Sequence, residues 1–414
     1  DPAKPELGRL VDSMTGHLNV GLIRTLAGTG EPGWSGDGAA ALAACLNEPK
    51  SLTLDGEGNL FIADSENHVI RRIDRKTGCI RTVAGCIQGA GPEASPVQPP
   101  PAAEGSSDDP FAESDAVHSH AFTQQTDLSG TVRYLVAGTA PAKRFSGDGG
   151  PADQALLNFP TAVVVDRGGH LYIADTLNHR VRRVDAVTGV ITTVAGLGQP
   201  RYSGDGGIAM EAGLNEPVAL AVSDAGHLYI ADQNNNRVRA VDLGIGVIRT
   251  VAGTGTAAYN GDGMAAAETG LAGPGGLALT ADGTLFIADS FSGRIRAVDL
   301  GTGLISTVAG DGGEYKYQGP NEAPSRSLSR PSGIVLDEAG NLFFTDSDNH
   351  LVRRWDRATG RITRIAGVGV ASYGGDDRAA LDASLSYPFG IVMARAGYLL
   401  VADTFNHRIR EIAL

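Results

Sequence analysis

A fixed 57-residue period governs this sequence. A glycine, an aspartate and an arginine recur in register, with the glycine six residues before the aspartate and the arginine seven residues after it. The aspartates are Asp64, Asp175, Asp232, Asp289, Asp346 and Asp403, and the last five are spaced 57 residues apart. A period of this length indicates a solenoid, a propeller or an array, in which each repeat buries its apolar face only against its neighbours.

Each repeat has the pattern of four short strands. In the copy at 160–196, an almost continuous apolar run at 160–166 indicates a strand buried on both faces. Strands at 171–175, 181–185 and 190–195 follow, separated by turn residues. Four antiparallel strands of this kind make a propeller blade, so the predicted fold is an all-β propeller. The expected complete blades are 49–85, 160–196, 217–253, 274–310 and 331–367.

The two ends of the chain are predicted to share a blade. The last repeat, 388–412, lacks a fourth strand, and the segment 21–28 ends in the same Ala-Gly pattern as the fourth strands of the other repeats. We therefore expect 21–28 to complete the last blade, which removes the exposed edges of an open array. Residues 1–20 lack periodicity and are interpreted as an N-terminal tail preceding one domain, 21–414.

The segment 86–138 departs from the pattern. Gly85 and Gly138 are 53 residues apart, near the period, and 131–138 and 121–127 have the pattern of a fourth and a third strand. Residues 96–109 are instead rich in Pro, Ala and Ser without an apolar run, as in loops or disordered segments. We predict a degenerate seventh blade at 86–138. The alternative is a six-bladed ring with a long insertion at 86–130.

The three residues at the end of the turn after each motif aspartate resemble those of a known repeat. Four repeats read Asn67-His68-Val69, Asn178-His179-Arg180, Asn349-His350-Leu351 and Asn406-His407-Arg408, whereas two depart as Asn235-Asn236-Arg237 and Ser292-Gly293-Arg294. The repeat resembles the NHL repeat over about residues 21–85 and 131–414. The resemblance implies a β-propeller. It also implies a binding scaffold or extracellular module, or more rarely a lyase or hydrolase with a metal in the central channel.

The amino-acid composition restricts the classes of function that we expect for this chain. The net charge of −13, from 34 basic and 47 acidic residues, argues against a nucleic-acid partner. No run of 18 apolar residues is present, so no membrane span is expected. Cys45, Cys79 and Cys86 lack metal-ligand spacing, and a Cys45–Cys86 disulfide or three free thiols both remain open. The start at Asp1 without Met fits a processed product, and we expect a periplasmic or secreted location.

The connections between blades supply the candidate site. These loops of about 20 residues leave an outermost strand and return to the axis, so they are expected to cover one face of the disc. They carry an aromatic residue at Trp34, Phe145, Tyr202, Tyr259, Tyr317 and Tyr373, and an acid at Asp37, Asp148, Asp205, Asp262 and Asp376. Aromatic residues suit a recognition surface. The alternative is that the aromatics pack under neighbouring loops and that each Asp forms a turn or caps a short helix.

The recurring polar residues are expected to be structural. A catalytic pair is needed once, so six Asp–Arg copies indicate a network that holds the blades, and the in-register histidines are interpreted in the same way. One Asp per loop is a thin ligand set for calcium, which takes six to eight oxygens. No nucleophile elbow, phosphate loop or His-Glu-x-x-His motif is present.

We therefore predict a non-enzymatic binding or scaffold module, without an assigned cofactor. It would recognise a protein or a glycan through the long-loop face. A metal-dependent lyase or hydrolase acting in the central channel is the alternative, and a self-assembling structural protein is a further one.

Overall fold

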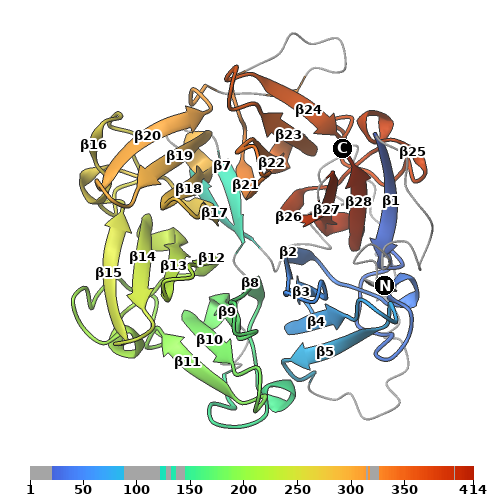
Figure 1. Ribbon diagram of the computed structural model, residues 1–414, viewed down its shortest axis with the longest axis horizontal. Helices are drawn as coiled ribbons and strands as arrows, with labels where there is room; N and C mark the ends of the chain where they lie inside the picture. Colours follow the sequence, from blue (N-terminus) through green and yellow to red (C-terminus); the bar gives the residue numbers. More distant parts are fainter. Residues whose placement is uncertain are drawn as a thin grey trace, which may run out of the picture.

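A computed structural model describes residues 21–87, 122–126, 132–136, 145–313, 316–317, 326–395 and 397–414. Its strands form six blades around a central axis (Figure 1). In the first three blades, from the axis outward, the strands are β2 (Pro49–Leu54), β3 (Leu60–Asp64), β4 (Val69–Ile73) and β5 (Ile80–Ala84); β8 (Pro160–Val165), β9 (Leu171–Asp175), β10 (Arg180–Val184) and β11 (Ile191–Ala195); β12 (Pro217–Val222), β13 (His227–Asp232), β14 (Arg237–Asp242) and β15 (Val247–Ala252).

The other three blades have the same antiparallel order, and two of them gain a short outer strand. Their strands are β17 (Pro274–Leu279), β18 (Thr284–Asp289), β19 (Arg294–Asp299), β20 (Leu304–Ala309) and β16 (Met264–Ala265); β21 (Pro331–Leu336), β22 (Leu342–Asp346), β23 (Leu351–Trp355) and β24 (Ile362–Ala366); β26 (Pro388–Arg395), β27 (Tyr398–Asp403), β28 (Arg408–Ala413), β1 (Leu22–Ala27) and β25 (Arg378–Ala379). The predicted all-β propeller is confirmed.

The ring has six blades, so the preference for seven was wrong and the six-bladed alternative is correct. The innermost strands contact one another in the closed order β2, β8, β12, β17, β21, β26 and back to β2. Because β2 packs directly on β8, no blade fits between them. The strands β6 (Phe122–Thr126) and β7 (Val132–Val136) pair as a separate two-stranded hairpin. The expectation for the tail at 1–20, and most of the expectation for 86–130, lie outside the described residues.

Blades are held together by apolar contacts between neighbouring sheets. Leu52 and Ile62 of the first blade, for example, share one buried cluster with Leu400 of the last. The glycine that ends each fourth strand is required by close packing. At Gly85, φ is +89° and a Cβ would lie 2.5 Å from the carbonyl oxygen of His68. The Val-Ala-Gly ending in the sequence therefore marks the point where the chain leaves one blade and crosses to the next.

The expected short helices in the loops are single 3-10 turns. They are η1 (Ala41–Ala43), η2 (Ala152–Gln154), η4 (Ala209–Glu211), η6 (Ala266–Glu268) and η9 (Ala380–Asp382). A second set follows the motif aspartate, as η3 (Thr176–Asn178), η5 (Gln233–Asn235), η7 (Ser290–Ser292), η8 (Ser347–Asn349) and η10 (Thr404–Asn406). None has a side-chain cap, so the suggestion that the loop aspartates cap these turns was wrong. In the part of the chain described, no helix is long and apolar enough to cross a membrane.

The N-terminal strand closes the ring as predicted. β1 pairs antiparallel with β28, with Ile23 opposite Ile412 and Thr25 opposite Arg410. Arg24 extends from β1 to Glu411 on β28, with its Nε 2.7 Å from the Glu411 carboxylate. Both side chains are buried, so this ion pair joins the two ends of the ring in a water-poor environment.

Replacing Arg24 with methionine tests whether the Arg24–Glu411 ion pair stabilises the closed ring. The change leaves the buried Glu411 carboxylate without its cation, which typically costs about 3–5 kcal/mol. We expect the free energy of unfolding, measured by chemical denaturation, to fall by that amount. Arg24→Met combined with Glu411→Leu removes both charges and is expected to recover most of the loss. A single variant as stable as the wild type would show that the pair does not hold the ring closed.

Candidate functional site: the long-loop face and the mouth of the central channel

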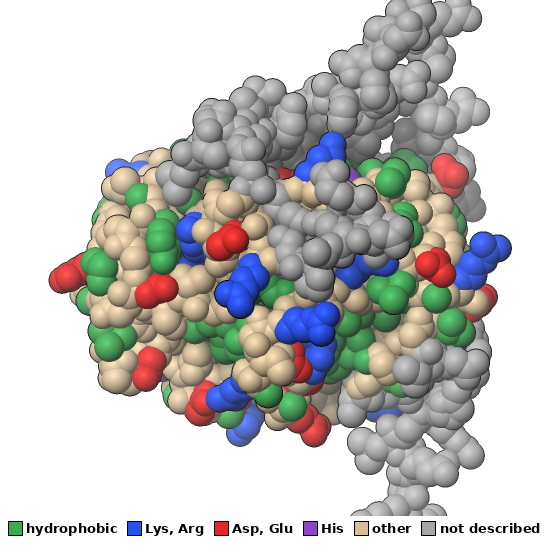
Figure 2. Space-filling view, turned by 90° about the horizontal axis from the view of Figure 1, so that it is seen from above, with side chains coloured by type: hydrophobic (Ala, Val, Ile, Leu, Met, Phe, Trp, Pro, Cys, Tyr) green, Lys and Arg blue, Asp and Glu red, His purple; other side chains and the backbone are tan. Residues whose placement is uncertain are grey.

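The loops between blades and the turns between second and third strands lie at the same end of the blades. The inner strand begins where the second strand ends, as the pairing of Pro49 with Asp64 shows. We call this end of the disc the long-loop face, represented by the fully described loops 28–48, 196–216, 253–273 and 367–387. When the disc is viewed edge-on, its surface carries Lys and Arg side chains interspersed with Asp and Glu side chains (Figure 2).

The motif aspartate and arginine are buried in every blade, and in five of the six they form the expected ion pair; Asp289 and Arg296 do not pair directly. Asp175 is fully buried and accepts hydrogen bonds from the Asn158 backbone N–H at 2.7 Å and from the Asn178 amide at 2.9 Å. The Arg182 guanidinium lies 3.2 Å away. Burial raises the pKa of Asp175 to about 6, against the opposing effects of the Arg182 charge and these hydrogen bonds. The carboxyl thus ties the long loop to the second and third strands.

The loop aspartates bind the same buried arginines. Five of the arginines carry ion pairs of 2.5–3.0 Å, namely Asp37–Arg71, Asp148–Arg182, Asp205–Arg239, Asp262–Arg296 and Asp376–Arg410. In the sequence of the loop that carries Tyr317, Pro320 takes the place of the aspartate, and Arg353 donates to the Ser327 carbonyl oxygen at 3.0 Å. The aspartates therefore fasten the loops onto the blades.

The loop aromatics stack on arginines at the outer part of this face. Tyr202 lies 3.7 Å from the guanidinium of Arg237 and 4.9 Å from that of Arg239, measured to the ring centroid, and its hydroxyl donates to Asp205 at 2.8 Å. Phe145, Tyr259 and Tyr373 repeat this double stacking. Trp34 and Tyr317 each lie over one arginine, at 5.9 Å and 5.5 Å. These contacts give the aromatics a structural role, and their predicted role in recognition stays a prediction.

Two substitutions of Tyr202 distinguish the contribution of ring stacking to stability from that of the hydroxyl hydrogen bond. Phe145 occupies the equivalent position without a hydroxyl, so Tyr202→Phe is expected to cost no more than about 1 kcal/mol. Tyr202→Ala removes both cation–π contacts and the buried ring face, and is expected to cost about 2–3 kcal/mol. Chemical denaturation measures both. Equal losses in the two variants would contradict stacking as the main contribution.

The motif histidines join neighbouring blades. Each sits at positive φ at the end of the turn that follows the motif aspartate, and its Nδ1 accepts a backbone N–H from the next blade. The pairs are His68 with Phe159, His179 with Glu216, His350 with Tyr387 and His407 with Glu48, at 2.9–3.2 Å. Burial lowers the pKa of His179 and of His350 to about 4, so these rings are neutral acceptors. The histidines are occupied as blade connectors, as expected from their recurrence.

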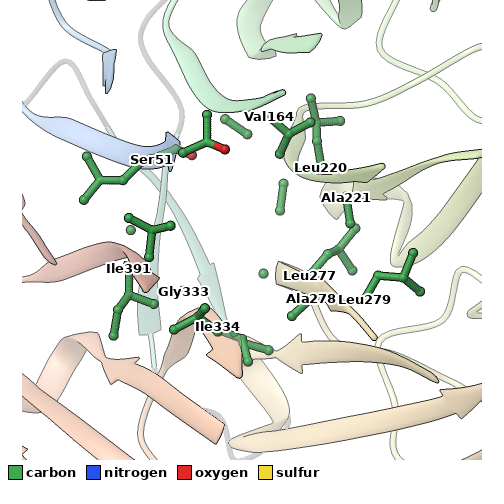
Figure 3. Close-up of a pocket in the computed structure, with 18 of the residues that line it drawn as sticks. Ser51, Val164, Leu220, Ala221, Leu277, Ala278, Leu279, Gly333, Ile334 and Ile391 are labelled. Atoms are coloured by element: carbon green, nitrogen blue, oxygen red, sulfur yellow. The ribbon is translucent and has the colours of Figure 1, made fainter. Parts of the chain in front are cut away.

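A cavity of about 770 Å³ runs along the axis, in the size range of ligand sites. Its wall is mostly aliphatic, with Val164, Leu220, Leu277, Ile334 and Ile391 from five different inner strands around the opening (Figure 3). At the long-loop end the wall becomes polar and includes Lys50, Thr161, Gln233, Ser290, Arg330 and Ser332. We call this end the channel mouth.

Two cations flank one phenyl ring at the channel mouth. Lys50 Nζ lies 4.7 Å and Arg330 Cζ 5.2 Å from the centroid of Phe389. Lys50 also lies 5.5 Å from the rings of Phe159 and Phe405. Its ammonium pairs with Glu48 at 3.0 Å, and Arg330 pairs with Asp348 at 3.6 Å, longer than a hydrogen bond. Two paired cations and several aromatic rings thus lie on the side of the mouth formed by β2, β21 and β26.

Gln233 marks the opposite side of the mouth and breaks the repeat. In five blades the residue after the motif aspartate is Ser or Thr, whose hydroxyl donates to the proline carbonyl of the next inner strand, as Ser290 does to Pro331 at 2.7 Å. Gln233 replaces this hydroxyl, is 5% exposed, and its Oε1 has no hydrogen-bond partner among the described residues. The neighbouring strand has Gly275, where a Cβ would lie 3.5 Å from Gln233 Nε2 and 2.4 Å from Ser290 Oγ. The glycine therefore makes room for the Ser290 hydroxyl, whereas a Cβ at 3.5 Å from the Gln233 amide would make an ordinary contact.

Two carboxyls in the surrounding loops have pKa values near neutrality. Burial raises the pKa of Glu66 to about 7; the charge of Glu48 raises it too, and that of Lys50 lowers it. Burial likewise raises the pKa of Glu216 to about 7, against a hydrogen bond from Asn234. The Oε2 atom of Glu216 is buried without a partner among the described residues.

Glu216 predicts a pH dependence of stability. Its pKa rises from 4.5 to about 7 on folding, so its stabilising contribution is complete below pH 4.5 and is lost as the pH rises through 7. Relative to Glu216→Gln, the wild type should lose about 1–3 kcal/mol of unfolding free energy between pH 5 and pH 8. Denaturation curves at several pH values measure this, with the exposed Glu211→Gln as the matched control. A constant difference between wild type and Glu216→Gln would contradict the assignment.

The channel mouth is a poor fit for a divalent metal. No group of three or more His, Cys, Asp or Glu positioned to hold an ion occurs within the described ranges. Lys50 and Arg330 at the mouth would repel a divalent cation. The loop aspartates are engaged by arginines and point to no calcium site. Cys45, Cys79 and Cys86 are all free, so the possible Cys45–Cys86 disulfide is not formed.

Comparison with known proteins agrees with this architecture. The family model described as "SMP-30/Gluconolactonase/LRE-like region" matches residues 144–381, more than half of the chain. The chain belongs to this family. The family includes gluconolactonase-like enzymes and binding modules. The NHL resemblance is confirmed by relatives named for that repeat.

Two relatives in sequence and one solved structure illustrate what this chain is similar to. Protein SUPPRESSOR OF QUENCHING 1 of Arabidopsis thaliana is 32% identical over 64% of this chain and 26% of its own length. NHL repeat-containing protein 2 of Bos taurus is 28% identical over 69% of this chain and 42% of its own length. A solved structure of a protein of unknown function from Bacteroides thetaiotaomicron has a TM-score of 0.59 at 16% identity, covering 94% of this chain and 75% of the other. This chain thus spans less than half of either curated relative, and the solved structure shows the fold alone.

The channel-mouth residues were not among the sequence-predicted candidates. Those candidates were chosen because they recur, and recurrence selects the residues that build every blade. The missed signal was departure from the repeat: Lys50, Gly275 and Phe389 occupy one register position, immediately after the proline that begins each inner strand. Gln233 and Arg330 likewise depart from the residues at their equivalent positions. Aligning the six copies at the start of the inner strand would have shown this variation.

Proposed function

We propose that this propeller is a non-enzymatic binding module that takes up the end of a glycan at the channel mouth. The observation that carries the proposal is the convergence of Lys50, Arg330 and Gln233, residues that break the repeat, on one cavity. Blade-specific residues are where a repeat scaffold acquires a particular ligand. A concave site of about 770 Å³ suits a glycan end better than the flat surface of a folded protein partner.

The enzymatic alternative has less support from the described residues. A metal-dependent lyase or hydrolase needs converging acidic, His or Cys ligands, whereas the mouth presents two cations and aliphatic walls. A periplasmic or secreted location is part of the proposal and is testable by cell fractionation.

A glycan array with the purified propeller tests the proposal. Val218 follows Pro217 at the channel mouth, in the register position that Phe389 occupies in the last blade, so the backbone should accept Val218→Phe. The added ring narrows the mouth and should weaken capture of any bound glycan by about tenfold or more. Val187→Phe, at a 91% exposed turn, is the matched control and should bind like the wild type. No capture of any glycan by the wild type, or full capture by a folded Val218→Phe variant, would overturn the proposal.

A further inference from the structure

The wall of the axial cavity follows one aliphatic pattern in all six blades. The residue three positions after the proline that begins each inner strand lines the cavity in every blade, as Leu52, Val163, Leu220, Leu277, Ile334 and Ile391. The next position is Val164, Ala221, Ala278, Val335 and Val392 in five blades and Thr53 in the first. We call these two positions the apolar band. Its labelled side chains in Figure 3 come from separate strands and surround the open axis, so the middle of the cavity is a ring of aliphatic groups.

Part of the apolar band is not covered by the described residues. Its members Val164, Ala278, Val335 and Val392 are only half-buried, although they line a cavity at the centre of the disc. Covering aliphatic surface with an apolar group is favourable, by about fourfold in affinity for each buried methylene. A sugar at this depth would instead place hydroxyl groups against aliphatic side chains, which is unfavourable. The band therefore favours an apolar ligand group, and the cavity volume of about 770 Å³ gives that group room.

A hydrogen-bond acceptor lies between the apolar band and the long-loop face. Gln233 lines the cavity, and its Oε1 is buried without a partner among the described residues. The preceding residue, Asp232, pairs with Pro217 at the start of β12, whereas the band begins three residues further along that strand. A buried acceptor without a donor is unfavourable, and a ligand hydroxyl at this point removes that cost. A polar and an apolar contact site thus follow each other along the axis.

We propose that the cavity binds an amphiphilic glycoside, whose sugar donates a hydroxyl to Gln233 at the channel mouth and whose aliphatic group lies along the apolar band. This inference rests on the proposed function and specifies what is attached to the sugar. Lys50 and Arg330 keep their ion pairs with Glu48 and Asp348, since the ligand requires neither cation to change partner. Affinity should rise with the length of the aliphatic group, because a purely polar glycan end leaves the band in contact with water.

Two probes with the same sugar and different aliphatic groups test the inference. We expect isothermal titration calorimetry to show that hexyl β-D-glucoside binds about tenfold or more tightly than methyl β-D-glucoside, because burial of about two methylenes suffices for this difference. Since this comparison uses the wild type alone, it decides the question even where a variant fails to fold. Equal or tighter binding of the methyl glucoside overturns the inference but leaves the glycan-binding proposal standing. Failure of both probes also overturns the inference, and an empty glycan array overturns the proposed function as well.

Three variants assign the two contact sites. Ala278→Phe fills part of the apolar band and should weaken binding of the hexyl probe by about tenfold or more, with a smaller effect on the methyl probe. Val164→Thr adds a hydroxyl to the band with little change of shape and should weaken the hexyl probe by about threefold, whereas Val187→Thr at the exposed turn is the matched control. Gln233→Leu should weaken both probes to a similar extent, because it removes a hydroxyl contact that they share. Folded Ala278→Phe and Val164→Thr variants that both bind the hexyl probe like the wild type would overturn the assignment of the aliphatic group to the band.

Discussion

The buried motif aspartate is the group on which each blade depends, and in five of the six blades it forms an ion pair with the motif arginine. A fully buried carboxylate is costly unless several donors surround it, and here a backbone N–H, a side-chain amide and a guanidinium all converge on it. These donors come from the preceding loop, the 3-10 turn and the third strand. One carboxylate therefore fixes three segments at once. The arginine extends the network outward to the loop aspartate and the stacked aromatic ring.

Contacts between blades follow from the same turn. The 3-10 turn directs the histidine Nδ1 toward the next loop and the Ser or Thr hydroxyl toward the next inner strand, so each blade positions its successor. Where these residues change, the bond between blades changes too. Gln233 gives up the hydroxyl contact, and Gly293 gives up the imidazole contact. The first change leaves Gln233 Oε1 on the channel wall without a partner among the described residues, and after the second the Arg330 N–H donates to Asp346.

The sequence was sufficient for the features that repeat. Register predicted the strands, the Asp–Arg network and the closure by 21–28, because each copy carries the same local signals. The repeat register also led to the wrong number of blades. The 53-residue spacing between Gly85 and Gly138 is close to the 57-residue period, although the segment between them has no apolar run that could form an inner strand. Whether six inner strands already close a ring depends on how β2 packs against β8, a long-range contact with no local signal. The mouth was missed because Lys50, Gln233 and Arg330 are far apart in sequence and line one cavity only when the ring closes.

The closure also sets how the molecule would respond to tension. β1 and β28 run antiparallel, and the Gly21 N–H donates to the Ala413 carbonyl oxygen at 2.8 Å, so the two ends of the domain lie side by side. A force that separates these ends loads the hydrogen bonds between β1 and β28 one after another, as in a zipper, instead of all together in shear. The pairing of β1 with β28 would open at low force, starting at Gly21 and continuing until it reached the Arg24–Glu411 ion pair. The other five blades would bear little of the load.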